Sequence, residues 1–507
     1  SRLPRFSPKG PDMPKYLKIH SSDTVAVALE PLAQGTAIDG LGVVLLDEVP
    51  QGHKFAVTPH QPGDRVIKYG SVIGLAKEAI PVGRHIHTHN IGTALGGLQD
   101  YAYAGPAAEA APAKREAPTI QAFVRANGEI GVRNDLWIIP LVGCVNGLAK
   151  NAAKRFEKMG LLPEGSRVTV LEHPYGCSQL GGDLDNTRNI LRDFAIHPNA
   201  GGVLVMGLGC ENNTRALFTQ GFEHPDPRRL RYLTTQEVSD ELEASLEAMT
   251  ELAAVMREDK REPVGADRLR IGLKCGGSDG FSGITANPLL GALSDWLCGI
   301  GGATVLTEVP EMFGAEHLLM ERAESREVFE GVVTLINDFK QYFLDHNQPI
   351  YENPSPGNKA GGISTLEEKS LGCTQKAGLS PVRDVIRYAE RIRKPGLTLL
   401  EAPGNDGVAV TALAAAGCHI VLFTTGRGTP LGGVVPTMKI ATNTAMAEKK
   451  RHWIDFNAGP IAEATATVDS LLPSFIDSIL AVANGKEARN EENDVHDLVI
   501  FKSGVTL

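Results

Sequence analysis

The chain has 507 residues, of which 42% are apolar, and a formal net charge of −10 with a pI near 5.8. A single hydrophobic core does not grow to this length, so two or three domains are expected. The acidic balance argues against a nucleic-acid partner, and no apolar run approaches the roughly 18 residues of a membrane helix. Seven cysteines, an odd number in a long chain, argue against a disulfide framework and for a reducing cytoplasm.

The first part of the chain predicts a small all-β domain over residues 13–92. Short apolar runs such as "TVAVAL" and "SVIGLA" are separated by turn residues, and no long helical pattern interrupts them. Residues 93–118 hold glycine, alanine and proline without periodicity, which predicts a linker. The next stretch, "QAFVRANGEIGVRN", places two extended runs around Asn127 and Gly128, a pattern typical of a type I′ hairpin.

From about residue 134 the pattern becomes apolar strand, glycine turn and helix. Examples of the strands are "LWIIPLVG", "GVLVMGLG" and "IVLFTT", with helical stretches at 237–258 and 315–346 between them. Such alternation predicts a mostly parallel sheet covered by helices, hence an α/β body. We divide this body into a middle domain at 119–262 and a C-terminal domain at 263–507, which closes with a helix and an extended segment.

Cysteines follow four of the predicted strands, where open α/β sheets bind their ligands. They are Cys144, Cys177, Cys210 and Cys275, each beside a glycine. Thiolates bind iron or zinc, and carboxylates on neighbouring loops can complete such a site. The alternative is a small buried residue in a tight turn. No CxxC pair is present, so a zinc ribbon is not indicated. The candidate metal ligands are Cys177, Cys210, Cys275, Asp279 and Glu308.

Nucleotide cofactors are disfavoured by the glycine pattern. The stretch "GLGCEN" begins like a dinucleotide-binding fingerprint, but Asn212 occupies the position of the third glycine. No phosphate-binding lysine loop is present either.

Histidines alternate in "RHIHTHN", so a strand would place His85, His87 and His89 on one face. That face is a candidate for binding metal or substrate, and a solvated basic strand is the equal alternative. His53 and His173 are further single candidates. With a pKa of about 6.5 in its ordinary state, His173 could act as a general base without tuning.

Two cations lie in glycine-rich loops where substrate is expected. Arg427 in "TTGRGTP" suits bidentate capture of a carboxylate, or else it pairs with a nearby acid. Lys359 in "NPSPGNKAGG" suits a clamp, or a general base if it is desolvated. Polar loops of the α/β body and the histidines of the N-terminal domain supply the other substrate-binding candidates. The full set is Ser278, Asn358, Arg427, Thr429, His53 and His87.

Taken together, these loops resemble a known family. The segments "CGGSDGFSGITANP", "LTEVPEMFGAE" and "YENPSPGNKAGGISTLEEKSLGCTQKAG" are similar to those of the altronate dehydratases, and the likeness runs over nearly the whole chain. The wider family includes galactarate dehydratase, while details such as "GCVNG" and "IFKSGVTL" resemble the altronate branch.

The resemblance implies an antifreeze-like β-clip domain followed by an α/β body with a Rossmann-like parallel sheet. It also implies dehydration of a sugar acid with ferrous iron, in which Mn²⁺ could substitute. The expected reaction takes D-altronate to 2-dehydro-3-deoxy-D-gluconate and water, or acts on galactarate or a related sugar acid. A homodimer or higher homo-oligomer is expected, with the middle domain as the candidate dimerisation unit.

Three functional hypotheses follow. The first is a mononuclear iron dehydratase, with Arg427 as the carboxylate clamp and His173 or Lys359 as the base. The second is an iron–sulfur hydro-lyase, in which three of the four cysteines hold a [4Fe–4S] cluster with one open iron. The third is a sugar-acid binding protein without catalysis.

Overall fold

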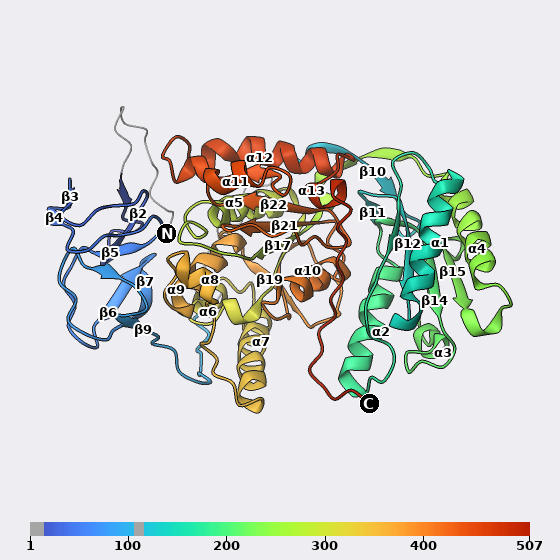
Figure 1. The fold of residues 1–507 in the computed structure, drawn as a ribbon, viewed down its shortest axis with the longest axis horizontal. Coiled ribbons are helices and arrows are strands. Elements are labelled where there is room, and N and C mark those ends of the chain that lie inside the picture. The colour runs from blue at the N-terminus through green and yellow to red at the C-terminus, as the bar shows by residue number, and fades with distance from the viewer. Residues whose placement is uncertain (1–14, 106–115) are drawn as a thin grey trace.

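The computed structural model describes residues 15–105 and 116–507, and it has three parts arranged in a row (Figure 1). The N-terminal strands lie at one end, the middle domain at the other, and the C-terminal domain lies between them. Residues 13 and 14 of the predicted first domain and 106–115 of the predicted linker fall outside the described residues. Within the described residues, no helix is long and apolar enough to cross a membrane.

The N-terminal domain is built from short antiparallel strands, as predicted. One sheet has the order β1-β2-β5-β8 and a second has the order β6-β7-β9, while β3 and β4 form a hairpin. Several of the turns that join the strands have glycine at positive φ. Successive side chains of a strand point to opposite faces, which lets apolar residues face the core. The strands are β1 (Tyr16–Leu17), β2 (Val25–Ala28), β3 (Ala37–Ile38), β4 (Val43–Val44), β5 (Lys54–Ala56), β6 (Arg65–Lys68), β7 (Ser71–Ala76), β8 (His85–Ile86) and β9 (Ile91–Gly92).

The first part of the predicted linker packs against the C-terminal domain. The Tyr101 hydroxyl donates to Glu316 Oε1 at 2.5 Å, and the buried Lys340 ammonium lies 3.1 Å from the same oxygen. Tyr103 stacks at a tilt on Phe329, with ring centroids 5.2 Å apart. Residues 93–105 are therefore held along the body, because their aromatic side chains find apolar and charged partners there.

The middle domain carries a four-stranded parallel sheet of order β13-β12-β14-β15. The central strand β14 is buried along its whole length, as expected for an apolar run covered on both faces. Its strands are β12 (Asp135–Pro140), β13 (Val168–Val170), β14 (Ala200–Gly207) and β15 (Leu230–Thr234). Its helices are α1 (Asn146–Met159), α2 (Gly181–Ala195), α3 (Arg215–Thr219) and α4 (Glu241–Met256).

A small antiparallel sheet joins the two α/β units. The predicted hairpin around Asn127 and Gly128 is confirmed, with β10 (Thr119–Val124) paired to β11 (Ile130–Gly131). The predicted type I′ turn is wrong, because in this turn only Gly128 has a positive φ and its N–H donates to the Arg125 carbonyl in a longer connection. β10 also pairs with β16 (Arg261–Gly265), which follows the middle domain. Ile120 and Ala122 belong to the C-terminal core, so the hairpin packs with that domain.

The C-terminal domain has a seven-stranded sheet of order β19-β20-β18-β17-β21-β22-β23, in which every pairing is parallel. The α/β class and the mostly parallel sheet are thereby confirmed. The strands are β17 (Arg270–Cys275), β18 (Ala303–Leu306), β19 (Val382–Ile386), β20 (Gly396–Leu400), β21 (Ile420–Thr425), β22 (Thr437–Ala441) and β23 (Phe456–Asn457). The helices are α5 (Ala286–Ile300), α6 (Glu316–Met320), α7 (Arg326–Asp345), α8 (Pro356–Ala360), α9 (Leu366–Cys373), α10 (Asp406–Ala415), α11 (Thr444–Lys449), α12 (Val468–Ala483) and α13 (Arg489–Glu492).

The predicted helix at 315–346 is divided in two, as α6 and α7. The Ser325 side chain accepts a hydrogen bond from Val328 N and so starts α7 afresh. Val328, Val332 and Phe339 then repeat at helical spacing and face the core. The N-cap signal in the sequence accounts for the break.

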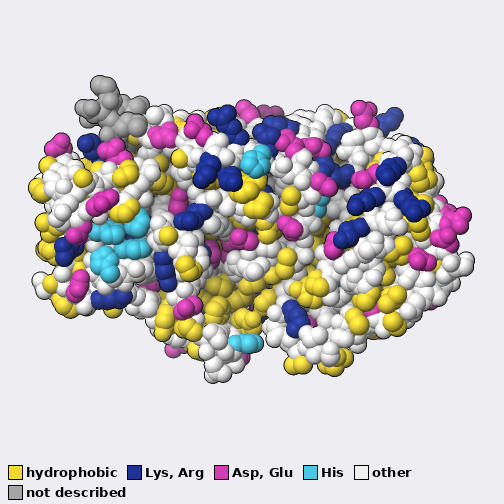
Figure 2. All heavy atoms as spheres, viewed as in Figure 1, with side chains coloured by type: hydrophobic (Ala, Val, Ile, Leu, Met, Phe, Trp, Pro, Cys, Tyr) yellow, Lys and Arg dark blue, Asp and Glu magenta, His cyan; other side chains and the backbone are white. Residues whose placement is uncertain are grey.

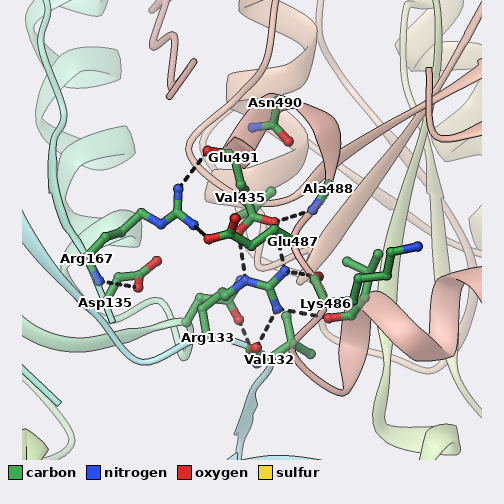
Figure 3. A network of polar contacts seen from close by, with 12 residues as sticks. Val132, Arg133, Asp135, Arg167, Val435, Lys486, Glu487, Ala488, Asn490 and Glu491 are labelled. Atoms are coloured by element: carbon green, nitrogen blue, oxygen red, sulfur yellow. Dashed lines mark hydrogen bonds and ion pairs between the residues drawn. The ribbon is translucent and has the colours of Figure 1, made fainter. Parts of the chain in front are cut away.

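A buried ion-pair network ties the middle domain to the end of the chain (Figure 3). The Arg133 guanidinium binds both carboxylate oxygens of Glu491 at 2.7 Å, and it also donates to the carbonyl of Val482. Arg167 donates to the Glu491 carbonyl at 3.0 Å. Burial, followed by the charge of Glu491, raises the pKa of the nearby Asp135 to about 7. Fork-shaped pairing of this kind fixes the orientation of the two elements.

Candidate active site

The site lies at the carboxyl ends of β17, β18 and β21, which are neighbours in the C-terminal sheet. Cys275 is the last residue of β17 and lies opposite Thr424 of β21. Glu308 follows β18 with its backbone in the left-handed region, at φ 68°. Because parallel strands end at the same edge, these residues meet there. Helix α9 adds Cys373 from a distant part of the sequence.

Three buried side chains form a compact group of donors. The Cys275 and Cys373 thiols lie 3.2 Å and 3.1 Å from Glu311 Oε2, and their sulfurs are 3.3 Å apart. Each of the three side chains offers one ligand atom, and these atoms all lie within 4.8 Å of one another. Within the described residues, no other group of three or more His, Cys, Asp or Glu side chains is as compact. Two sulfurs and one oxygen in a dry pocket suit a borderline or soft divalent ion.

Buried lysines surround the donors. Lys376 Nζ is 3.0 Å from Cys275 Sγ and 2.6 Å from Glu308 Oε2, and Lys274 Nζ is 2.6 Å from the other oxygen of Glu308. Lys369 Nζ lies 2.7 Å from Glu311 Oε1. Lysine is almost never fully buried unless it is paired, so this arrangement depends on every partner being present.

The pKa values show how the cluster is charged. Burial opposes the charge on Lys369 and Lys376, but Glu311 raises the pKa of the first, and Cys275 and then Glu308 raise that of the second. Burial also opposes the charge on Glu311, yet the two lysines hold its pKa well below the usual range. A hydrogen bond with Cys275, followed by burial, raises the pKa of the Cys373 thiol.

Charge balance decides whether a cation fits. Three lysines (Lys274, Lys369 and Lys376) face three carboxylates (Glu308, Glu311 and Asp406), so the cluster is neutral while both thiols are protonated. A divalent cation adds two positive charges, and ionising both thiols offsets them. The donor set therefore fits a divalent metal ion, because binding releases protons from cysteine rather than leaving buried charge unpaired.

Polar groups expected to bind substrate border this cluster. Lys369 Nζ also lies 3.2 Å from Asn358 Oδ1, and the Asn358 amide donates to the Ser278 carbonyl at 2.9 Å. The Ser278 hydroxyl is buried and has no hydrogen-bond partner among the described residues. Arg427 is exposed and donates to the Gly357 carbonyl at 3.3 Å, on the short helix α8 that also carries Lys359. These four predicted residues are thus brought to one rim.

The N-terminal domain reaches the same rim. His53 Nε2 is 3.4 Å from the Ala360 carbonyl, and His87 Nδ1 is 2.9 Å from Ser364 Oγ. Figure 2 shows histidine side chains gathered on the face of this domain. Burial, with His53 next, lowers the pKa of His85 to about 3, and burial with Lys54 next lowers that of His87 to about 4. The rings are therefore neutral near pH 7, which suits hydrogen bonding to polar groups.

A second ion-pair cluster holds the N-terminal domain in place. Lys54 and Lys68 each bind one carboxylate oxygen of Glu368 at 2.8 Å, and all three side chains are buried. Burial lowers the pKa of Lys54 to about 8. Burial opposes the charge on Glu368, but the two lysines lower its pKa to about 2. A cavity of only about 10 Å³ lies beside this cluster, lined by Tyr69 and Ser278 among others.

Comparison with known families covers all three domains in order. The descriptions that match are "Altronate/galactarate dehydratase SAF domain" over residues 14–94, "D-galactarate dehydratase/Altronate hydrolase, second domain" over 122–258 and "D-galactarate/Altronate dehydratase, C-terminal" over 266–506. The chain belongs to the altronate/galactarate dehydratase family.

Similar proteins span almost the full length of the chain. An altronate dehydratase of Escherichia coli (strain K12) is 56% identical over 97% of this chain and 100% of its own. An altronate dehydratase of Bacillus subtilis (strain 168) is 54% identical over 98% and 100%. A galactarate dehydratase (L-threo-forming) of Escherichia coli (strain K12) is 33% identical over 93% of both chains. The resemblance predicted from the sequence is confirmed, and the chain is a sugar-acid dehydratase of this family.

Several predicted site residues lie away from the Cys275 group. Cys177 and Cys210 are exposed on loops of the middle domain, whose sheet is separate from that of Cys275, so the structure does not bring them together. His173 is also in the middle domain and buried. Its Nε2 lies 2.8 Å from the Pro140 carbonyl, and its Nδ1 accepts from Tyr175 N at 3.1 Å. Both ring nitrogens are therefore occupied by backbone, which is the pattern of a structural histidine.

Asp279 and Thr429 shape loops in the C-terminal domain. The Asp279 carboxylate is bonded to Thr442 at 2.9 and 3.0 Å and to Asn443 at 3.1 Å, and it also accepts from Phe281 N. Its lone pairs are thus committed to loop geometry, and it does not join the donor group. Thr429 Oγ1 accepts from Leu431 N at 3.3 Å. Glu308 lies beside Cys275, but both of its oxygens bind lysines.

Sequence reasoning missed most of the buried charges. Glu311 and Cys373 were not among the predicted metal ligands. Lys369, Lys376 and Glu368 lie in "LEEKSLGCTQK", where charges on a short helix are ordinarily solvated. In the structure this polar helix is buried at every position. Burial is a property of the tertiary structure, so no local pattern could have marked these charges.

Proposed function

We propose that this protein dehydrates D-altronate to 2-dehydro-3-deoxy-D-gluconate and water. Support comes from the two altronate dehydratases that are 54–56% identical over nearly the whole chain. The observation that carries the chemistry is the buried Cys275–Glu311–Cys373 group, set among lysines next to a rim of carboxylate- and hydroxyl-binding side chains.

We assign the metal to Cys275, Glu311 and Cys373, in place of the predicted set. Ferrous iron is the proposed ion, because thiolate donors favour it over the harder Mn²⁺. Substitution by Mn²⁺ stays a prediction. When bound, such an ion supplies Lewis-acid stabilisation for negative charge on the substrate. Holding it in this pocket requires both thiols to lose their protons, so affinity should fall at low pH.

The chain's own residues divide the remaining tasks. Arg427 binds the substrate carboxylate from the solvent side, where its guanidinium is exposed. Ser278 and Asn358 bind hydroxyl groups, and Lys369 stabilises the charge that develops when the C2 proton leaves. Lys359, on the same short helix as Gly357, accepts that proton as a neutral amine and passes it to the C3 hydroxyl, which leaves as water. The enol that results becomes the 2-keto product.

Substrate preference tests the proposal. Altronate, galactarate and mannonate should be assayed side by side, without oxygen and with Fe²⁺, and altronate should be preferred. One clamp arginine suits a monocarboxylic acid, so preference for the diacid galactarate would overturn the assignment. Chelation should remove activity and Fe²⁺ with a thiol should restore it, whereas full activity after exhaustive chelation would exclude a metal role.

The proton acceptor needs its own comparison. Lys359→Met should abolish turnover while the protein stays folded. His173→Asn should act mainly through stability, because it breaks the two backbone contacts. If the His173 variant is folded and inactive while the Lys359 variant retains more than a tenth of its activity, the roles are reversed. The homo-oligomer and the cytoplasmic location stay predictions, and mass measurement in solution would test the first.

A further inference from the structure

Three exposed cysteines lie at one edge of the middle domain. Cys144 follows β12, Cys177 follows β13 and Cys210 follows β14, and these strands are adjacent and parallel. The other four cysteines of the chain are buried or half-buried. Cysteine is among the residue types most often found inside proteins, so the gathering of all exposed thiols at one sheet edge calls for a reason.

Hydrogen bonds hold the three loops against one another. Gly143 N donates to the Tyr175 carbonyl at 2.9 Å, which links the first loop to the second. Asn213 N donates to the Gly176 carbonyl at 3.0 Å, and the Asn213 amide donates to the Leu141 carbonyl at 3.1 Å, which links the third loop to both. The cysteine loops therefore form a single connected surface.

The contact between the first two loops needs glycine. A Cβ on Gly176 would lie 2.0 Å from the Leu141 carbonyl oxygen, and the residue has a φ of 97°. Both features exclude a side chain, so the backbone beside Cys177 lies directly on the strand end that leads to Cys144. This close approach brings the two cysteine loops together.

The carboxylate in the loop of Cys210 is already engaged. Glu211 is buried and accepts from Leu208 N and Gly209 N, so it shapes the loop that carries Cys210. The buried Asn213 Oδ1 in the same loop has no partner among the described residues. The three thiols are the soft donors of this edge, and their side-chain contacts are weak, with Gln236 Nε2 3.7 Å from Cys210 Sγ and Ser178 Oγ 3.7 Å from Cys177 Sγ.

We infer that Cys144, Cys177 and Cys210 hold a [4Fe–4S] cluster, with the fourth iron open to an oxygen ligand from solution. Ligands of one zinc or iron ion, each about 2.3 Å from the metal, can be no more than about 4.6 Å apart. Within the described residues, the three sulfurs do not form a group that compact. A cluster binds each thiolate to a different iron and so takes wider spacing.

The inference goes beyond the proposed function and does not rest on it, because the cluster can be measured without substrate. Two ferrous and two ferric ions with four sulfides give a cluster of net charge +2, so assembly needs no further oxidant. Three thiols lose their protons to solvent as they bind. Exposure of these thiols allows the cluster to enter without unfolding of the domain.

Reconstitution of the full chain with ferrous iron, ferric iron and sulfide, without oxygen, tests the site. We expect broad visible absorbance and about four sulfides per chain, with about four irons beyond the single ion proposed at Cys275, Glu311 and Cys373. The triple variant Cys144→Ser, Cys177→Ser, Cys210→Ser should lose nearly all of the absorbance and the sulfide. Cys275→Ser and Cys298→Ser are matched controls elsewhere in the chain and should retain the absorbance and the sulfide. A reconstituted protein that holds iron but no sulfide, or full absorbance in the triple variant, would overturn the inference.

A second measurement covers the case in which the triple variant fails to fold. In the metal-free wild-type protein, iodoacetamide should modify Cys144, Cys177 and Cys210, because all three are exposed. After reconstitution, mass spectrometry should find the three protected together, at least tenfold in rate. Equal alkylation before and after reconstitution would exclude a cluster there. Loss of altronate turnover with an intact cluster would instead count against the proposed function alone.

Discussion

The middle and C-terminal domains both end parallel strands in loops with a cysteine beside a glycine, yet the cysteines there have opposite surroundings. In the middle domain Cys144, Cys177 and Cys210 are exposed. In the C-terminal domain Cys275 is buried beside Cys373 and paired charges. The same local pattern, a cysteine after an apolar strand, therefore supports two kinds of site.

The difference comes from what packs over each sheet edge. Helix α9 and the N-terminal domain cover the C-terminal edge, and Lys54 and Lys68 reach across to Glu368 on that helix. Burial makes each charge there depend on a partner, since an unpaired charge in the interior is costly. The middle-domain edge keeps its thiols in water, where they need no such compensation. Whether a cysteine at a strand end belongs to a charge network therefore depends on what packs over that end of the sheet.

The largest loss of stability should follow from breaking the ion pairs that hold the N-terminal domain to helix α9. Glu368→Gln leaves Lys54 and Lys68 buried without their counter-charge and should lower the free energy of unfolding by about 3–5 kcal/mol. Urea unfolding at pH 7 measures it. Asp47→Asn, which breaks an exposed pair with Arg84, is the control and should cost at most about 1 kcal/mol. Equal effects of the two changes would contradict the role given to the cluster.

The donor group should give the next largest effect. Glu311→Gln removes the carboxylate charge between Cys275 and Cys373, so kcat/KM should fall at least about 100-fold, or about 2.7 kcal/mol. Metal content should fall with it. Glu401→Gln, on a half-exposed carboxylate paired with Arg387, should leave both nearly unchanged. A Glu311 variant with normal metal content and turnover would rule out this group as the metal site.

The exposed rim should respond less strongly. Arg427→Lys keeps the charge but loses the bidentate fork, and kcat/KM should fall roughly 10- to 100-fold, or about 1.5–3 kcal/mol. Steady-state kinetics with altronate measures the loss. Arg383→Lys changes an exposed arginine paired with Glu324 and serves as the control. Activity near that of the wild type in the folded Arg427 variant would refute the clamp.

The smallest effect should be a loss of stability in acid, which comes from His85 and His87 of the N-terminal domain. Folding lowers the pKa of His85 to about 3 and of His87 to about 4 from the ordinary 6.5. Their contribution is complete above pH 6.5 and declines below it as the unfolded state takes up protons. It is lost by about pH 4 for His87 and by about pH 3 for His85. Solvent screening limits it to roughly 1 kcal/mol for each ring.

Urea midpoints at pH 7 and pH 5 measure this dependence. His87→Gln keeps a hydrogen-bonding side chain near Ser364 but cannot titrate, so the difference between the two midpoints should shrink. An unchanged difference would show that other groups carry the acid response.

Local patterns were enough for several features. Alternating apolar runs predicted the N-terminal strands, and Asn127 with Gly128 predicted the hairpin that pairs β10 with β11. The strand-glycine-helix pattern predicted the parallel sheets, because burial on both faces demands continuous apolar runs. The strands β15, β19 and β22 read "LRYLT", "VRDVI" and "TMKIA", and charged residues interrupt each apolar run, so local patterns indicate them less clearly.

The amino-acid sequence by itself determined the fold class and the family, because these depend on short-range patterns and long matching segments. Ser278, Asn358 and Arg427 stay predicted substrate-binding residues, which the structure places on one rim. Only the tertiary structure separated Cys275 from Cys177 and Cys210, and only it joined Cys275 to Cys373 across nearly a hundred residues. The physical reason is that burial and charge pairing are collective. A lysine or glutamate reads as solvated in any local window until packing removes the water around it.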